Sequence, residues 1–501
     1  MDSFFLLMQG FETALSWSNL LYCFIGVMLG MVIGVLPGLG PVSGTALLIP
    51  ITFGMEPVSA IIMLSGIFYG AMYGGTITSV LVNVPGEAAS VITCIDGYEM
   101  TKKGRAGAAL GVSAIGSFIG GIVAVLALTF VGPALSNFAL KFGPPEFFAI
   151  MLLGMLMIVA LMGKSLVRGL IAAVIGLLLA MVGQDMVTGE FRYTFGSIEL
   201  MDGIDFAVMA MGLFGISEIL LNAENPAKVT KPPKVKGLLP NRGEWGPTLK
   251  SVGRGTGIGM LLGVIPGANS IIASTFSYIL EKKVAKDPSR FGKGAIEGVA
   301  GPETANNAHS GAALIPLFSL GLPSSPTMAV ILGAFVMHGL TPGPALFTKN
   351  PDFVWGLIAS MFIGNLLLLI MNMPLVGMWA KIALIPYKLL FPIILMVILV
   401  GTYSLNSSLW DVVLMLIFGI IGYIMKKLDI PMAAMIVTFI LGSQLETSML
   451  QSLSISTDGF LIFFTQPISA IIMSVALIIF AVSIYSGVKN KRGNLANDVE
   501  M

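Results

Sequence analysis

The chain is dominated by long apolar runs, many of them close to the length that a helix needs to cross a bilayer, about 20 residues. Only 11% of its 501 residues are charged, whereas a typical soluble domain carries about 25%. Because lipid offers the backbone no hydrogen-bond partners, such runs span a membrane as helices. We therefore predict an all-α polytopic membrane protein. The clearest runs are Gly107–Phe130, Phe147–Leu161, Leu166–Met181, Phe206–Leu221, Phe353–Met371, Leu389–Val400, Val412–Met425 and Ile468–Ile484.

Lysine and arginine are unevenly distributed, and their positions predict the topology. By the positive-inside rule, loops rich in these residues lie on the cytoplasmic side. The basic segments are Lys102–Arg105, Asn222–Arg254, Lys282–Lys293, Lys426–Lys427 and Lys489–Arg492. The neutral or acidic segments are Phe53–Val58, Gln184–Asp205 and Ser443–Asp458. We therefore place the N-terminus outside and the C-terminus inside, with an odd number of full crossings, about nine to eleven.

One hydrophilic segment divides the chain into two halves. Residues 222–254 are rich in proline, lysine and arginine, which is typical of a cytoplasmic linker. We predict an N-terminal transmembrane half at residues 1–221, this linker, a C-terminal transmembrane half at residues 255–488 and a short cytoplasmic tail at residues 489–501.

A Pro-Gly break recurs in the two halves. The sequence Gly-Val-Leu-Pro-Gly at Gly34–Gly38 returns 229 residues later as Gly-Val-Ile-Pro-Gly at Gly263–Gly267. A second break, Asn83–Glu87, has a looser counterpart in Gly321–Pro326. Proline removes a backbone donor and glycine permits a reversal, so a helix ends at such a pair. Paired interrupted helices indicate the binding site of a transporter, although a simple kink is the alternative at any single break.

The charges around these breaks predict that the two repeats are inverted. The segment after the first Pro-Gly break, Gly54–Pro57, has no basic residue, whereas the equivalent segment Lys282–Lys293 has five. Conversely, the basic cluster Lys102–Arg105 corresponds to Thr341–Asp352, which has a single lysine. Equivalent loops thus lie on opposite sides, as in an inverted repeat. Basic residues flank the second Pro-Gly segment on both sides, so we expect a re-entrant hairpin that enters and leaves from the cytoplasm.

Several motifs at the breaks belong to one known pattern. They are Leu-Pro-Gly-Leu-Gly-Pro at Leu36–Pro41, the stretch Tyr69–Ser79, the segment Asn83–Ser90 with Asp96–Tyr98, and Gly-Pro-Glu-Thr-Ala-Asn-Asn-Ala at Gly301–Ala308. Together they resemble the large membrane subunit of the tripartite tricarboxylate transporters, the TctA family, and the resemblance covers nearly the whole chain.

This resemblance implies both function and partners. It implies ion-driven import of citrate-like or other carboxylates across the bacterial inner membrane, together with a small four-span membrane subunit and a periplasmic solute-binding protein. The chain departs from the family pattern at Asn269-Ser270 and at His309-Ser310, both near the presumed site. The resemblance therefore leaves the carboxylate unassigned.

A carboxylate that crosses a membrane needs its charge compensated, and the break regions contain no lysine or arginine. Helix N-termini, which carry about +0.5 charge and free N–H groups, can serve instead, with hydroxyl and amide side chains. We predict substrate contacts from Gly38, Ser43, Asn83, Pro85, Gly86, Gly267, Asn269, Ser270, Ser324 and Ser325. Asn83 is the foremost candidate because it precedes Pro85-Gly86 and has two donors and an acceptor. A hydrogen bond between helices is the alternative role for such an asparagine.

Two acidic residues adjoin the breaks, and carboxylates inside a membrane are costly enough to suggest a function. Glu87 and Glu303 can neutralise a coupling cation or carry a coupling proton, although Glu87 is also suited to cap a half-helix. The predicted ion-coupling residues are Thr76, Ser79, Glu87, Glu303, Asn306 and Asn307. We expect Na⁺ or H⁺ as the coupling ion, with no cofactor and no metal site. His309, beside the Asn-Asn pair, is a candidate proton sensor.

Other classes of protein have less support. The sequence lacks His-Glu-x-x-His, Gly-x-Ser-x-Gly and any cluster with metal-ligand spacing, so we do not expect an enzyme. It also lacks a complete nucleotide-binding motif, which argues against ATP-driven transport. The main alternative is a carboxylate/ion symporter that works without a binding protein. Neighbouring genes for a four-span protein and a secreted binding protein would discriminate between the two.

Overall fold

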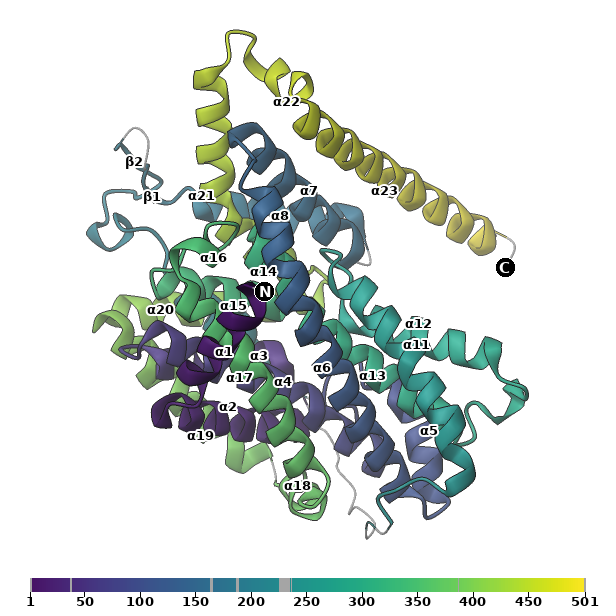
Figure 1. The fold of residues 1–501 in the computed structure, drawn as a ribbon. Coiled ribbons are helices and arrows are strands. Elements are labelled where there is room, and N and C mark those ends of the chain that lie inside the picture. The colour runs from purple at the N-terminus through teal and green to yellow at the C-terminus, as the bar shows by residue number, and fades with distance from the viewer. Residues whose placement is uncertain are drawn as a thin grey trace.

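The computed structural model describes residues 2–36, 38–162, 165–185, 189–224, 235, 237–385 and 387–499. Most of this described part is helical, and its single sheet is a two-stranded antiparallel hairpin that pairs Gly183 with Arg192 (Figure 1). The predicted all-α architecture is therefore confirmed.

The elements that begin before the predicted linker belong to the predicted N-terminal half. They are α1 (Asp2–Ala14), α2 (Trp17–Val35), α3 (Gly40–Leu48), η1 (Ile49–Thr52), α4 (Pro57–Val82), α5 (Val91–Lys102), α6 (Ala106–Ala139), α7 (Pro144–Met162), α8 (Leu166–Ala180), β1 (Gly183–Gln184), β2 (Phe191–Arg192), η2 (Ile198–Leu200), α9 (Phe206–Ala210), the π-helical segment η3 (Met211–Ile216) and α10 (Ser217–Glu224).

The remaining elements form the second half. They are η4 (Arg242–Glu244), α11 (Trp245–Gly263), α12 (Ser270–Val284), η5 (Pro288–Arg290), α13 (Glu297–Ala312), α14 (Leu314–Leu320), α15 (Pro326–Met337), α16 (Leu346–Lys349), α17 (Pro351–Asn372), α18 (Val376–Ile382), α19 (Tyr387–Asn406), α20 (Leu409–Lys427), α21 (Met432–Ile455), η6 (Gly459–Leu461), α22 (Ile462–Thr465) and α23 (Pro467–Val499).

In the described part of the chain, ten helical segments are long and apolar enough to cross a membrane. Seven of the eight predicted runs lie in these segments, and the eighth forms the shorter helix α8. The other three are α2, α4 and α21, which were not among the clearest apolar runs. Ten lies within the expected range of nine to eleven, while the odd number of crossings and their sidedness stay predictions.

Helices α2 and α4 pack closely through glycines spaced four residues apart. A Cβ atom at Gly26, Gly30 or Gly34 of α2 would overlap a backbone carbonyl of α4. Gly70 and Gly74 of α4 in turn meet the backbone of α2. Small residues at this spacing let membrane helices approach backbone to backbone, so α4 is held deep inside the protein, with residues 59–82 all buried.

Helices α11 and α13 repeat this arrangement in the second half. A Cβ atom at Gly255 or Gly259 would overlap a carbonyl of α13, and one at Gly263 would lie 2.7 Å from the His309 carbonyl. These glycines follow those of α2 at the same 229-residue spacing as the Pro-Gly break. The repeat therefore extends over a whole glycine-faced helix in each half, whereas the inverted orientation of the two repeats stays a prediction.

Asp96 of α5 ties the first half to the second. Its Oδ1 accepts hydrogen bonds from the backbone N–H groups of Gly292, Gly294 and Ala295 at 2.7–2.9 Å, and its Oδ2 accepts one from the Tyr278 hydroxyl at 2.9 Å. Asp96 is fully buried, and four donors satisfy its charge. This contact fixes the turn that leads into α13, the helix carrying Glu303.

The second Pro-Gly segment forms a helical hairpin of α11 and α12, as its flanking charges predicted in outline. The two helices pack against each other, and Arg254 of α11 pairs with Glu281 of α12 at 2.5 Å. Neither helix is among the ten candidate spans. Their re-entrant insertion into the membrane stays a prediction.

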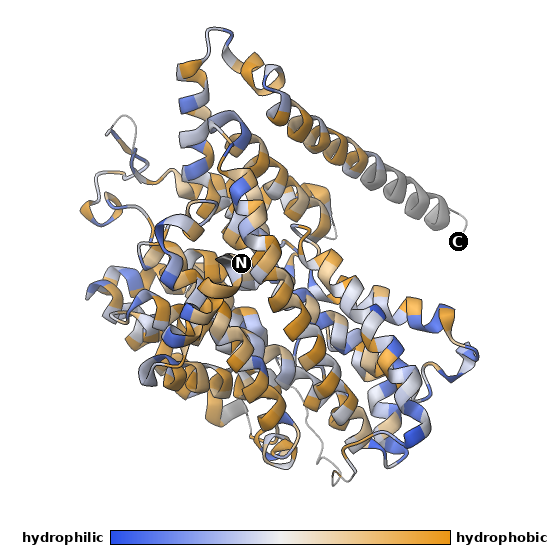
Figure 2. Ribbon diagram, viewed as in Figure 1, coloured by the Kyte–Doolittle hydropathy of each residue, from blue (hydrophilic) through white to orange (hydrophobic). Residues whose placement is uncertain are grey.

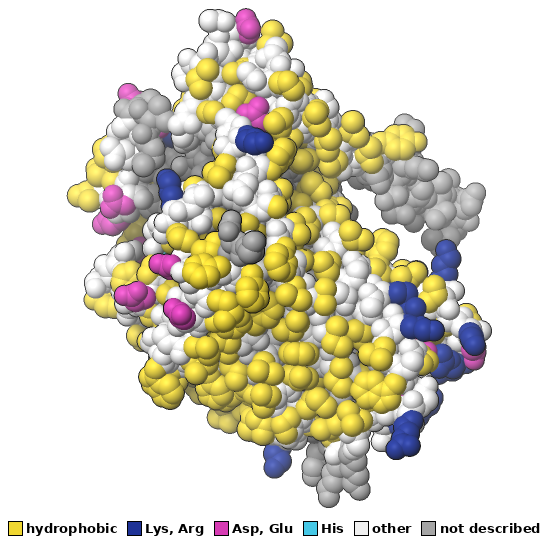
Figure 3. Space-filling model, viewed as in Figure 1, with side chains coloured by type: hydrophobic (Ala, Val, Ile, Leu, Met, Phe, Trp, Pro, Cys, Tyr) yellow, Lys and Arg dark blue, Asp and Glu magenta, His cyan; other side chains and the backbone are white. Residues whose placement is uncertain are grey.

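Charged and apolar side chains occupy different parts of the surface. On the face in Figure 3, most Lys and Arg side chains gather around α5, α11 and α12, and hydrophobic side chains cover the middle of the molecule. Helix α23 extends away from the body, and much of its length is hydrophobic (Figure 2). An apolar surface of this extent is expected where lipid surrounds a protein.

The predicted linker and tail are partly helical. Helix α11 begins at Trp245, inside the predicted linker. One guanidinium nitrogen of Arg105 donates to both carboxylate oxygens of Glu244, at 2.6 and 2.7 Å. This part of the linker is thereby attached to the end of α5. Residues 225–234 and 236 lie outside the described residues, and the backbone of α23 continues through the predicted tail to Val499.

Candidate functional site

Both Pro-Gly breaks end one helix and lead into the next. Helix α2 ends at Val35 and α3 begins at Gly40, while α11 ends at Gly263 and α12 begins at Ser270. The glycines of the two breaks, Gly38 and Gly267, have φ angles of +93° and +82°. Glycine adopts such angles without steric cost. Pro37 lies outside the described residues.

The second breaks also match each other. Helix α4 ends at Asn83 with φ +58°, and α14 ends at Gly321 with φ +72°, so both capping residues are left-handed. Among non-glycine residues, asparagine adopts this conformation most readily. Asn83 therefore occupies the position of a C-cap glycine.

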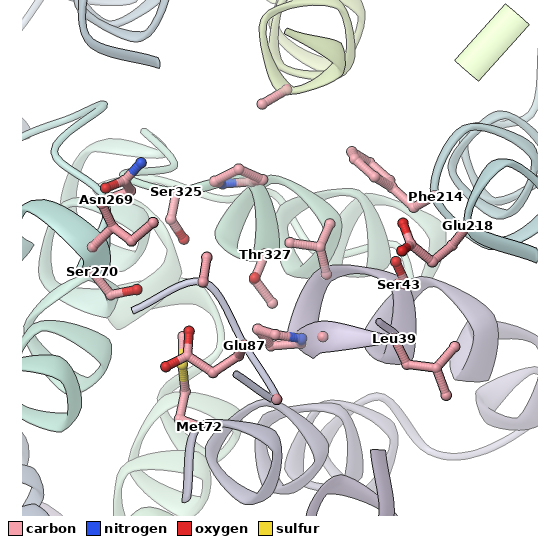
Figure 4. Close-up of a pocket in the computed structure, with 18 of the residues that line it drawn as sticks. Leu39, Ser43, Met72, Glu87, Phe214, Glu218, Asn269, Ser270, Ser325 and Thr327 are labelled. Carbon is pink, nitrogen blue, oxygen red and sulfur yellow. The ribbon is translucent and has the colours of Figure 1, made fainter. Parts of the chain in front are cut away.

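All four breaks meet at one cavity of about 520 Å³ (Figure 4). Asn269 and Ser270 lie on one wall, with Leu39 and Ser43 on the opposite wall and Glu87 between them. The lining residues from the breaks are Gly38, Leu39, Gly40, Pro41, Pro85, Gly86, Glu87, Ala88, Asn269, Ser270 and Ser325. The cavity thus draws on both halves of the chain.

Five helices begin at the wall of this cavity. Residues from the first turn of α3, α5, α12, α15 and α21 line it. The Asn269 side chain caps α12 by accepting from the Ile272 N–H at 3.2 Å, and Ser325 caps α15 by accepting from the Met328 N–H at 3.3 Å. The free N–H groups and positive dipole ends of several helices therefore converge on one space, which favours an anion.

A buried carboxylate, Glu303, lies behind this cavity and joins the two halves. Its Oε2 accepts a hydrogen bond from Thr76 at 2.6 Å, and its Oε1 accepts one from Thr93. Thr76 and Thr93 come from α4 and α5, whereas Glu303 belongs to α13. No lysine or arginine pairs with Glu303 in the described part of the chain, so hydroxyl groups alone solvate this carboxylate.

Glu87 forms the reciprocal contact. Its Oε1 accepts from Asn306 of α13 at 3.0 Å, and its Oε2 accepts from the Ala89 backbone N–H at 2.7 Å. The Ala89 N–H lies in the turn before α5, whose N-cap residue is Ser90 and has no side-chain cap. This contact therefore holds the turn and does not cap the helix. Glu87 is buried and lines the cavity, so it combines a contact in the turn with access to the cavity.

The six predicted ion-coupling residues belong to one connected region. Ser79 donates to the Gly75 carbonyl and to the hydroxyl of Ser90, which in turn donates to the Glu87 carbonyl. Asn307 donates to Ser117 at 2.8 Å and to the Glu303 carbonyl at 3.1 Å. The Oδ1 atoms of Asn306 and Asn307 are buried without a hydrogen-bond partner. These oxygens, hydroxyls and carboxylates are the ligand types that hard cations take.

The predicted substrate residues divide into two groups. Those that line the cavity are Gly38, Ser43, Pro85, Gly86, Asn269, Ser270 and Ser325. Those that do not are Asn83, Gly267 and Ser324. Gly267 instead donates its N–H to the Ser324 carbonyl at 3.0 Å, which holds the two breaks of the second half together.

Asn83 is the largest departure from expectation. We expected its side chain to point into the cavity, but Asn83 is exposed and absent from the cavity wall. The bias that proline imposes on the preceding residue acts on Val84, one position further along. Asn83 therefore caps α4 in the left-handed conformation, and the geometry gives it no substrate contact.

Several residues that line the cavity are not among the predicted site residues. The π-helical segment η3 contributes Phe214, and Glu218 follows it in α10. Lys426 reaches the wall from the end of α20. An acidic residue at the end of an apolar run was a usable signal for Glu218, whereas the lysine was interpreted solely as a marker of topology.

His309 lies at the cavity wall on the side of the second half. Its Nε2 is 2.5 Å from the Ala268 carbonyl oxygen. Because that carbonyl can only accept, Nε2 carries a hydrogen, and Nδ1 is buried without a partner. This arrangement anchors the α11–α12 turn to α13, and the predicted role of His309 as a proton sensor stays a prediction.

Comparison with known proteins gives a consistent result. Residues 20–437 match the tripartite tricarboxylate transporter TctA family. The chain is 45% identical, over 98% of both chains, to an uncharacterized 52.8 kDa protein in the TAR-I ttuC' 3' region of Agrobacterium vitis. It is 44% identical to an uncharacterized protein in the TAR-II ttuC' 3' region of the same organism, over 47% of this chain and 97% of the relative. No solved structure matches.

Proposed function

This chain belongs to the tripartite tricarboxylate transporter TctA family, and from that premise we propose that it is the large membrane subunit of an ion-gradient-driven importer of carboxylates. One observation carries the proposal. The four helix breaks, two from each half, meet at a single cavity lined by the first turns of five helices. Interrupted helices at the junction of two repeats are how many secondary transporters build a substrate site.

The cavity suits an anion. The helix N-termini of α12 and α15 supply N–H donors beside Asn269 and Ser325, and the first turn of neither helix contains an acidic residue. On the opposite wall, α3 begins at Gly40 beside Ser43. A carboxylate placed here exchanges water for fixed donors, so the cost of removing it from water is offset.

The two buried carboxylates suit a coupling cation. Glu87 reaches the cavity, and Glu303 lies one turn from Asn306, the residue that contacts Glu87. Unpaired carboxylates in a membrane are costly, and a bound Na⁺ or H⁺ would neutralise them. Because each carboxylate contacts the opposite half of the chain, occupancy by a cation would alter how the two halves are held together.

Charge sets the stoichiometry that such a carrier needs. The membrane potential contributes about 2.3 kcal/mol per elementary charge per 100 mV. A trivalent anion must therefore travel with more than three monovalent cations if the potential is to assist its import. Two carboxylates alone hold two such cations, so a trivalent substrate would require further ion sites or a partly protonated form.

We further propose that this subunit works with a small four-span membrane subunit and a periplasmic solute-binding protein in the bacterial inner membrane. The tripartite character of the family supports this proposal. The acidic segment Gln184–Asp205 is predicted to face the periplasm, the side from which the binding protein would approach.

Transport in reconstituted vesicles tests these proposals. Purified complex, with and without the binding protein, is supplied with citrate, succinate or acetate under an imposed Na⁺ or H⁺ gradient. We expect uptake of a di- or tricarboxylate that collapses with the ion gradient and requires the binding protein. Uptake driven by ATP with all gradients dissipated would refute ion coupling, and full uptake without the binding protein would instead identify a self-sufficient symporter.

A further inference from the structure

One basic side chain lines the cavity within the described part of the chain, Lys426 at the end of α20. Its Nζ pairs with Oε2 of Glu218, which follows the π-helical segment on α10 and also lines the cavity. The Lys426 side chain is 43% exposed and that of Glu218 is 13% exposed. The lysine therefore has room to move, while the glutamate is largely enclosed.

Glu218 is held in place by a second contact. Its Oε1 accepts from the amide of Asn222 at 3.2 Å, and the same amide nitrogen donates to the Glu218 backbone carbonyl at 2.9 Å. Asn222 also lies directly against Gly38 of the first break. Of the two charged partners, Lys426 is thus the one that can change partner without disturbing the cavity wall.

An acidic residue in the wall of an anion-binding cavity opposes binding unless a cation compensates it. Glu218 and Lys426 together contribute no net charge while they are paired. When an anion enters, Lys426 can move its ammonium group from Glu218 to the anion. Lysine suits such an exchange because its charge is compact and its four-carbon stem is flexible, and the Lys426 side chain is partly exposed to solvent.

A neighbouring ion pair joins the same two helices. Lys427 pairs with Glu224 at 2.6 Å, and Tyr423 donates a hydrogen bond to the same carboxylate at 3.1 Å. These residues join α20 to α10 as well, but none of them lines the cavity. Position at the cavity, rather than helix attachment, distinguishes Lys426 from Lys427.

We propose that Lys426 is a carboxylate-binding residue, and that Glu218 occupies it while the cavity is empty. The inference rests on the proposed function of the cavity as a carboxylate site. Glu218 lies across the cavity from Asn269 and Ser270 (Figure 4), so Lys426 and the N-terminus of α12 mark two separated anion positions. The ligand class that fits both is an anion with at least two carboxylates.

Binding to the purified transporter tests this assignment. The probes are citrate, succinate and acetate, and the readout is ligand-dependent thermal stabilisation titrated over concentration. For Lys426→Met we expect the apparent affinity for citrate and succinate to fall by about tenfold or more, as for loss of one charge-assisted contact. Lys427→Met, the matched control, should change the affinity by less than about twofold, as expected for a solvent-exposed ion pair outside the site.

The Glu218→Gln variant tests whether Glu218 competes with the substrate, by the direction in which the affinity changes. If Glu218 competes with the substrate for Lys426, its neutralisation should tighten citrate and succinate binding. If the pair merely joins two helices, both Glu218→Gln and Lys426→Met should lower thermal stability without ligand and leave the affinity unchanged, which would overturn the proposal. Lys426→Gln serves as a second neutral variant should the methionine variant fail to fold.

The outcome also separates this inference from the proposed function. Wild-type protein stabilised by citrate or succinate, with Lys426→Met and Lys427→Met behaving alike, would refute the role of Lys426 alone. Wild-type protein stabilised by none of the probes would refute the carboxylate cavity and this inference with it. Equal loss of acetate and succinate binding in Lys426→Met would refute the two-position arrangement.

Discussion

Replacing Glu303 by glutamine tests whether this buried carboxylate holds the coupling cation. Glu303→Gln keeps the size of the side chain. One of the Thr76 and Thr93 hydroxyls can still donate to the amide oxygen, while the other rotates to accept from the amide nitrogen. We therefore expect the variant to fold, at a cost of about 1 kcal/mol, the net value of one ordinary hydrogen bond.

The effect on cation binding should be much larger. Two unit charges 4 Å apart interact by about 4 kcal/mol at an effective dielectric constant of 20. At 1.4 kcal/mol per tenfold, removing that attraction lowers cation affinity by roughly several hundredfold. The assay is the initial rate of carboxylate uptake in vesicles as a function of Na⁺ or H⁺ concentration, normalised to folded protein.

Glu297→Gln is the matched control, because Glu297 is a buried acid on the same helix but pairs with Arg290 at 2.9 Å. We expect this variant to retain the wild-type cation dependence. A Glu303→Gln protein that folds normally and also retains the wild-type cation dependence would refute the reasoning and leave Glu303 as a contact between the two halves.

Further predictions concern the fold and the topology. Asn83→Gly should keep the yield of folded protein, whereas Asn83→Val should lower the free energy of unfolding by about 1–2 kcal/mol, because the left-handed conformation at this position strains a β-branched residue. A loss of substrate affinity in folded Asn83→Gly would instead support the predicted substrate contact. Gly30→Leu should abolish monodisperse protein, since a Cβ there meets the α4 backbone, while Gly257→Leu, facing open space, should be tolerated; equal yields would contradict this packing. Asp96→Asn should lower the free energy of unfolding by about 1–3 kcal/mol, because the four donors around Asp96 lose a charged acceptor. An unchanged melting temperature would contradict a stabilising role for this contact. A cysteine at Lys250 should react with an impermeant reagent from the cytoplasmic side alone, and labelling from the periplasm would reverse the predicted topology.

The helix breaks were predictable because their cause is local. Pro and Gly act on the backbone of their own and adjacent residues, so both Pro-Gly breaks and both second breaks were recognisable in the sequence. Gly38 and Gly267 indeed adopt the left-handed angles that such turns use. The same reasoning failed for Asn83 because its conformation follows from its position at the end of α4, one residue before the backbone that Pro85 restricts.

The glycine-faced helices show a limit of a different kind. Gly26, Gly30 and Gly34 are visible in the sequence, and so is their recurrence in α11. The spacing of these glycines predicts that another helix packs closely against this face. It does not identify which helix that is. The structure assigns α4 to α2 and α13 to α11.

Hydropathy and backbone chemistry are properties of short segments, so the amino-acid order suffices to predict a helical membrane protein with two sets of paired breaks. Which distant side chains meet is visible only in the folded molecule. Glu303 joins Thr93 from 210 positions away, and Lys426 pairs with Glu218 at the cavity wall. The physical reason is that such contacts depend on helix packing angles and on the rotation of each helix about its axis, which arise from the summed contacts of many residues across the whole bundle.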